Sequence, residues 1–163
     1  MMKEIIMPMI VLISSMYMSQ DVTAQQNLEQ HFIGSWQGTG HLMGSEATFD
    51  MRWQKKLGGQ FLKLTFQNSR TPENSSPVIF NAIAMYRPGA KEWTGTWFDV
   101  RGISFPLKGH VEDKTLTVDW GSSDTEQGRT VYALQNDGSM IVTDFILQQG
   151  SYTEFGKATY SKN

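Results

Sequence analysis

Gly34-Ser35-Trp36-Gln37-Gly38 opens the first in a long series of short segments in which apolar and polar side chains alternate. The polar stretch before it, 26–32, suits one or two helical turns at most. After it, within 47–56 and 60–68, apolar residues recur at every second position. This period of two is typical of strands with one buried and one solvated face. The sequence from residue 34 onward therefore predicts an all-β fold.

The expected strands follow one another directly, and each ends at a turn signal. Asn136-Asp137-Gly138 is one such signal, because glycine tolerates the positive φ that tight hairpins require. Consecutive strands with short connections predict an up-and-down antiparallel meander, and closing the meander removes its exposed edges. We therefore predict a single up-and-down antiparallel β-barrel of about 8–10 strands after a short N-terminal helical turn. The expected strands are 34–42, 47–56, 60–68, 78–86, 92–100, 103–111, 115–120, 129–135, 140–147 and 151–162.

The same alternation predicts which side chains point into the barrel. In 47–56 the inward residues are Phe49, Met51 and Trp53. In 140–147 the predicted apolar face consists of Ile141, Phe145 and Leu147. The segment 78–86 is apolar on both faces, so its pattern assigns neither face to the interior.

Residues 1–24 have the pattern of a signal peptide: a basic residue at Lys3, an apolar run over 5–18 and the small-residue ending Val22-Thr23-Ala24. The run of about 14 residues is shorter than the roughly 20 that a membrane-spanning helix needs, which disfavours the alternative of a membrane anchor. We predict an exported protein, periplasmic or secreted, with no membrane span. Its single domain would be 25–163.

Composition excludes several classes of function. The 14 Lys and Arg against 16 Asp and Glu give a formal net charge of −2. The basic residues form no stripe of the kind that phosphate backbones require, so we expect no nucleic acid partner. The chain has no cysteine, hence no disulfide and no thiol nucleophile. The three His are not paired at metal-ligand spacing and no Gly-x-Ser-x-Gly motif occurs, so the sequence predicts no metal site and no catalytic residue.

Taken in order, several stretches resemble the bacterial exported domain-of-unknown-function proteins of the calycin superfamily, which are related in shape to lipocalins, fatty-acid-binding proteins and nitrobindins. The resemblance implies a barrel with an internal cavity and no particular ligand. It implies that Trp36 plugs the closed end and floors the cavity, with Lys157 or Lys162 packed over its ring. The matching stretches are Gly34-Ser35-Trp36-Gln37-Gly38, Leu57-Gly58-Gly59-Gln60-Phe61-Leu62, Tyr86 with the turn after it, Trp93-Thr94-Gly95-Thr96-Trp97-Phe98-Asp99, and Ala158-Thr159-Tyr160-Ser161-Lys162.

One strand carries the predicted ligand site. Alternation places Trp93, Gly95, Trp97 and Asp99 on one face of 92–100. If this face points inward, it supplies flat apolar walls, space beside Gly95 and a carboxylate near the mouth, as a ligand cavity requires. Together with Trp36, these are the predicted ligand-binding residues. The alternative is that both Trp side chains fill the core and that Asp99 binds a backbone group at the following turn.

Nitrobindins hold haem through a His on their last strand, whereas 151–162 contains no His. Tyr152 is the alternative iron ligand there, and a buried tyrosine is its simpler interpretation. We therefore expect no cofactor. The predicted function is non-catalytic binding of a small apolar or amphipathic molecule inside the barrel. Two alternatives stay open: a structural barrel with a filled core, or an isomerase, cyclase or hydrolase using Asp99 or a carboxylate pair, either Asp50 with Asp99 or Asp144 with Glu154.

Overall fold

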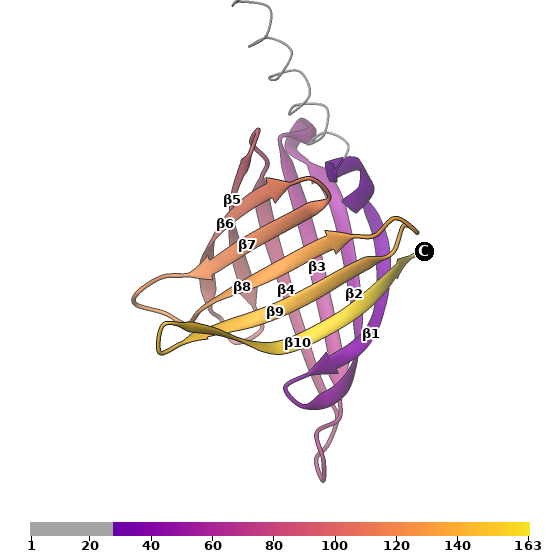
Figure 1. Ribbon diagram of the computed structural model, residues 1–163, viewed down its shortest axis with the longest axis vertical. Helices are drawn as coiled ribbons and strands as arrows, with labels where there is room; N and C mark the ends of the chain where they lie inside the picture. Colours follow the sequence, from indigo (N-terminus) through magenta and orange to yellow (C-terminus); the bar gives the residue numbers. More distant parts are fainter. Residues whose placement is uncertain (1–27) are drawn as a thin grey trace, which may run out of the picture.

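Ten antiparallel strands close into one barrel in the computed structural model, which describes residues 28–163 (Figure 1). Each strand pairs with the next along the chain, and β1 pairs with β10 to complete the circle. This confirms the predicted all-β, up-and-down antiparallel barrel. The strands are β1 (Gly34–Leu42), β2 (Ser45–Lys56), β3 (Phe61–Arg70), β4 (Val78–Arg87), β5 (Glu92–Asp99), β6 (Ser104–Glu112), β7 (Thr115–Gly121), β8 (Gln127–Leu134), β9 (Met140–Gln148) and β10 (Ser151–Lys162), with a 3-10 turn η1 (Leu57–Gly59).

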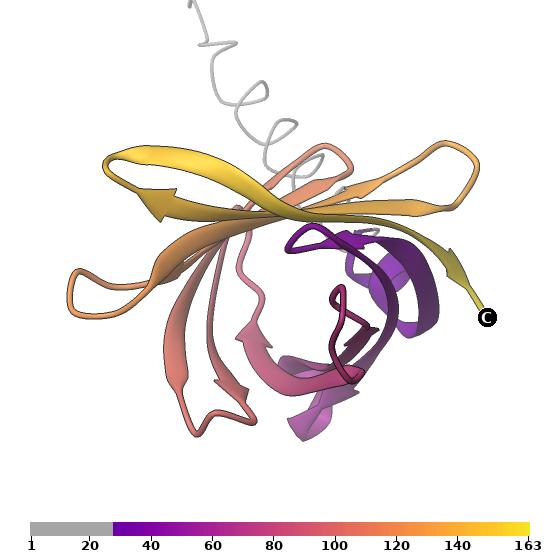
Figure 2. The same cartoon turned by 90° about the horizontal axis from the view of Figure 1, so that it is seen from below.

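The short helix 28–32 lies at one end of the barrel (Figure 1). Leu28 and Phe32 are buried, because residues four apart share one face of a helix and this face packs on the strands. Figure 2 shows the barrel from the opposite end, where the β1–β2 and β3–β4 connections lie. We call the helical end the closed end.

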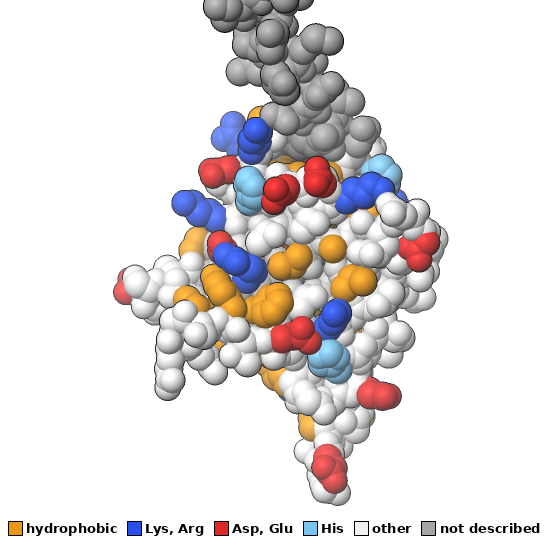
Figure 3. Space-filling model, in the orientation of Figure 1, with side chains coloured by type: hydrophobic (Ala, Val, Ile, Leu, Met, Phe, Trp, Pro, Cys, Tyr) orange, Lys and Arg blue, Asp and Glu red, His pale blue; other side chains and the backbone are white. Residues whose placement is uncertain are grey.

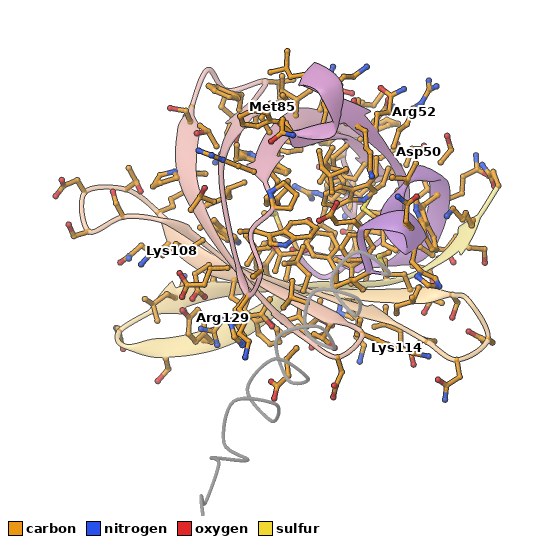
Figure 4. The ribbon with its side chains drawn as sticks, turned by 90° about the horizontal axis from the view of Figure 1, so that it is seen from above. Asp50, Arg52, Met85, Lys108, Lys114 and Arg129 are labelled. Atoms are coloured by element: carbon orange, nitrogen blue, oxygen red, sulfur yellow. The ribbon has the colours of Figure 1, made fainter. Side chains whose placement is uncertain are left out.

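Most of the predicted inward faces are confirmed. Phe49, Met51 and Trp53 are buried, while Asp50 and Arg52 between them point outward (Figure 4). Charged and hydrophobic side chains are interspersed on the outer surface of the strands that face the viewer in Figure 3.

Strand β4, whose pattern did not decide between its faces, buries Ala82, Ala84 and Tyr86 and leaves Ile79 and Ile83 exposed.

The prediction for β9 is wrong. Met140 and Val142 are the buried residues, whereas Ile141, Phe145 and Leu147 lie on the opposite, half-buried face. Both faces of this strand are apolar, and a shift of one residue exchanges them, so alternation did not determine the interior. The true inward series continues to Asp144.

Aromatic side chains fill the closed end. The ring of Phe32 lies 5.2 Å from that of Trp53, 6.2 Å from that of Trp93 and 6.0 Å from that of Tyr132. Trp36 is 1% exposed, and its Nε1 donates a hydrogen bond of 2.8 Å to the carbonyl oxygen of Phe32. The helix and the strands are therefore joined through a continuous aromatic cluster.

Lys162 is the basic residue over Trp36. Its Nζ lies 5.2 Å from the centre of the indole ring and donates a 2.8 Å hydrogen bond to the carbonyl oxygen of His31. Gly34 makes room for it: the φ angle of Gly34 is 129°, and a Cβ there would lie 2.7 Å from Cε of Lys162. The Gly-x-Trp sequence thus joins the first strand to the last.

The predicted signal peptide, 1–24, lies outside the described residues. Within residues 28–163, no helix is long and apolar enough to cross a membrane.

Candidate cavity site

A cavity of about 460 Å³ occupies the barrel between the aromatic cluster and the end opposite the helix. Its lining is mostly aromatic and aliphatic, and it includes residues beside the connections at that end, such as Met43, Arg101 and Glu126. We call this end the mouth. Further lining residues are Leu42, Met51, Phe66, Val78, Phe80, Trp97, Phe105, Leu107, Val118, Trp120, Val142, Ile146 and Phe155.

Tyr86 and Tyr132 separate the cavity from the closed end. Both line the cavity, and their rings lie 5.4 and 5.7 Å from that of Trp53 beneath them. Burial raises the pKa of both hydroxyls. The floor of the cavity is therefore neutral at physiological pH, with two polar atoms set in an aromatic surface.

Asp144 is the ionisable residue in the middle of the cavity wall, halfway along β9. Thr130 stands directly opposite it on β8, and its Oγ1 donates a hydrogen bond of 2.6 Å to Oδ1 of the carboxyl group. Burial raises the pKa of Asp144 to about 6, although the bond from Thr130 favours the ionised form. Near neutral pH the wall therefore carries a negative charge in poorly hydrated surroundings.

Asn68 adds a second polar group to the lining. It is 5% exposed, and its Oδ1 has no hydrogen-bond partner among the described residues. An unsatisfied buried acceptor of this kind costs about 1–3 kcal/mol.

Arg101 spans the mouth. Its guanidinium forms two bonds with Asp99, 2.8 Å from Nη2 to Oδ2 and 3.1 Å from Nε to Oδ1. Nη1 lies 3.1 Å from Oε2 of Glu126 in the β7–β8 connection. The group also lies 5.9 Å from the ring centres of Phe80 and Phe105. It thus links two connections at the mouth, with its charge balanced by two carboxylates.

Both carboxylate oxygens of Asp99 already accept hydrogen bonds from protein groups. Its side chain is 0% exposed, and it accepts hydrogen bonds from the backbone N–H of Arg101 at 2.9 Å and from Nε1 of Trp97 at 3.2 Å. Burial alone would raise the pKa of Asp99, but the hydrogen bonds from Arg101 and Trp97 outweigh it and hold that pKa below its ordinary value. The backbone contact that we gave as the alternative is therefore present.

Of the five predicted ligand-binding residues, one lines the cavity and four do not. Trp97 lines the cavity, whereas Trp36, Trp93, Gly95 and Asp99 are not part of the lining. Trp93 is fully buried in the closed-end cluster, 5.9 Å from Tyr86. A Cβ on Gly95 would meet the carbonyl oxygen of Met85 and lie 3.2 Å from Cα and Cδ1 of Tyr86, so strand β4 occupies the space that we expected a ligand to fill. Ligand contact by any of the five residues stays a prediction.

The alternative candidates from the sequence lie elsewhere. Glu154 contacts His41 at 3.1 Å on the exposed surface, and Asp50 is exposed on the outside of β2, so neither proposed carboxylate pair forms. Tyr152, 42% exposed, lies on the outside of the barrel, with the guanidinium of Arg129 4.5 Å from its ring centre. Within residues 28–163, no cluster of three His, Cys, Asp or Glu side chains is placed to hold a metal ion.

Sequence reasoning named Asp144 only as a possible partner of Glu154, and it did not select Asn68. The apolar face of β9 had been assigned to Ile141, Phe145 and Leu147, so Asp144 was not expected as a single carboxylate in the cavity lining. The available signal was that Asp144 continues the every-second-residue series Met140, Val142, Asp144 and Ile146, whose other members are apolar.

No known protein family matches the sequence, and a search of curated proteins gives no match. The cavity and its chemistry therefore carry the functional inference.

Proposed function

We propose that this protein is an exported, lipocalin-like barrel that binds a small apolar or amphipathic molecule in its interior. The cavity of about 460 Å³ is the observation that carries the proposal. It falls within the roughly 300–1,000 Å³ of typical ligand pockets, and such pockets combine apolar walls with a few polar groups. The same space argues against a barrel filled by its own side chains.

Export is supported by the pattern of residues 1–24. Intact-mass analysis of the protein recovered outside the cytoplasm should find Gln25 at the N-terminus. Full-length chain that is retained in the membrane fraction would contradict export as a free protein.

The binding proposal is tested with a neutral apolar fluorescent probe such as N-phenyl-1-naphthylamine. Trp97 lines the cavity, so a bound probe should quench part of the tryptophan emission and saturate at one site per chain. Native mass spectrometry of protein purified from its own host should show an added mass that is lost on denaturation. Absence of both saturable probe binding and added mass would contradict the proposal.

Asp144 supports a second candidate, an enzyme of isomerase, cyclase or hydrolase type. A carboxyl group with a pKa near neutrality inside a cavity suits general acid–base chemistry, and Asp99 is instead occupied by Arg101. If the barrel is an enzyme, the co-purified molecule should be converted over time by the wild type and not by Asp144→Asn. An unchanged ligand mass in both would favour the binding protein.

A further inference from the structure

The polar atoms along the cavity wall include hydrogen-bond acceptors that lack a partner. Thr130 occupies Oδ1 of Asp144, but Oδ2 forms no hydrogen bond with any described residue. Gly156 of β10 lies beside this oxygen without a side chain, and Asp144 itself is partly exposed and lines the cavity. Oδ1 of Asn68 is likewise without a partner among the described residues. Asn68 is on β3 and Asp144 on β9, with β2, β1 and β10 between them, so these acceptors stand on different walls.

The charges of the cavity are arranged unevenly between wall and mouth. In residues 28–163, no Lys, Arg or His forms an ion pair with Asp144. Arg70 and Arg101 are placed at the mouth, and Arg101 is already balanced by Asp99 and Glu126. A ligand inside the cavity therefore meets a wall carboxylate that no described cation pairs with, while the cations Arg70 and Arg101 lie at the mouth.

This arrangement discriminates among amphipathic ligands by their head groups. A carboxylate head would be repelled by Asp144 where water screens poorly, and a purely apolar ligand would leave a desolvated carboxylate without a partner. A protonated amine would pair with the carboxylate and donate a hydrogen bond to its unpaired Oδ2. Its apolar part would pack on the aromatic lining.

We propose that the ligand is an amphipathic amine whose protonated nitrogen binds Asp144 and whose apolar portion fills the rest of the cavity. The inference rests on the proposed binding function and adds to it the chemical class of the ligand.

Binding should depend on pH through Asp144, because a simple alkylamine stays protonated from pH 5 to pH 8. The titratable groups that face Asp144 are the hydroxyls of Tyr86 on β4, Tyr132 on β8 and Tyr160 on β10. Burial raises the pKa of all three above its usual value, so they remain neutral over this range. His41, on β1, points outward to Glu154.

The test is competition against the neutral probe at pH 8 by octylamine, octanol and octanoate, which share one apolar chain. We expect octylamine to bind at least about tenfold more tightly than octanoate, and more tightly than octanol. Asp144→Asn should reduce the difference between amine and carboxylate to less than about threefold while the probe still binds. Asp50→Asn is the matched control, since it removes the same charge from the exposed outer face of β2 and should leave the preference unchanged.

A second measurement does not need a variant. Between pH 8 and pH 5 the affinity of the wild type for octylamine should fall at least about fivefold, while that for octanol stays constant. Octanoate binding as tightly as octylamine, or an amine preference that persists in Asp144→Asn, would overturn the proposal while leaving the binding function in place. Failure of the wild type to bind the neutral probe, octylamine and octanol would instead remove the proposed function, and this inference with it.

Discussion

Trp93 and Trp97 lie four residues apart on the same inward face of β5, yet one belongs to a packed core and the other to a cavity wall. The difference comes from what faces them. Phe32 enters the closed end from the helix and packs against Trp93. At the mouth end no described element enters the barrel, so Trp97 borders open space. The alternation of residues thus identifies which side chains point into a barrel. Whether the interior there is packed or forms a cavity depends on a segment that enters the barrel, here the N-terminal helix.

The two ends also differ in their unsatisfied polar atoms. At the closed end these are donors, Nε1 of Trp53 and Nε1 of Trp93, enclosed by rings that leave no space for a partner. In the cavity lining they are acceptors, the enclosed Oδ1 of Asn68 and Oδ2 of the partly exposed Asp144. We infer that the enclosed atoms are a cost offset by packing, whereas Oδ2 of Asp144 can gain a partner from a ligand.

The largest expected effect is at the closed end. Trp36→Ala removes a fully buried indole and its hydrogen bond to Phe32, and should lower the free energy of unfolding by about 3–5 kcal/mol. Trp97→Ala is the matched comparison, and because this indole borders the cavity its loss should cost less than half as much. Urea denaturation measures both. A loss below about 1 kcal/mol for Trp36→Ala would mean that the closed end is not the stabilising core.

On the cavity side, the ionised carboxylate of Asp144 should lower the free energy of unfolding. Its pKa is raised to about 6 in the folded protein from about 3.9 unfolded, so between these values the folded state binds more protons. Stability should therefore fall as the pH rises from about 4 to 6, and the cost should persist above pH 6. Asp144→Asn should be about 2 kcal/mol more stable than the wild type at pH 8 and nearly equal to it at pH 4. Parallel curves for the two proteins would show that the carboxyl group is well solvated.

Trp97 should matter more for binding than for folding. Trp97→Ala should weaken binding of the neutral probe at least about fivefold, or about 1 kcal/mol, because the probe loses an aromatic wall. Trp97→Phe, which keeps a ring at that position, should retain most of the affinity. The comparison is made by fluorescence titration with protein shown to be folded by circular dichroism. Equal affinity in wild type and Trp97→Ala would place the probe elsewhere.

The sequence was sufficient for the architecture and for most inward faces, because strands such as β2 carry apolar residues on one side only. It failed at β9, where apolar residues on both sides make two registers equivalent in pattern. Asp144 lies on that strand, so the sequence named it only as a possible partner of Glu154 and did not place it alone in the cavity wall. Gly95 shows a different limit: the space beside a glycine is filled or empty according to the neighbouring strand, here Met85 and Tyr86 of β4. Periodicity carries no information about such contacts.

The smallest expected effect concerns the join between the first and last strands. The ammonium group of Lys162 lies over Trp36 and bonds to the carbonyl oxygen of His31, but the residue is exposed, so water weakens both interactions. Lys162→Met keeps the aliphatic stem beside Gly34 and removes the charge, and should lower the free energy of unfolding by about 0.5–1 kcal/mol.

Lys157→Met is the matched control. Lys157 is also an exposed residue of β10, and it lies opposite His41 in the β1–β10 ladder, away from the closed end. Its effect should be close to zero, and the loss in Lys162→Met should persist in high salt, since a cation over a ring at short range is screened less than separated surface charges. Equal effects of the two substitutions would show that Lys162 acts only through the net charge of the strand.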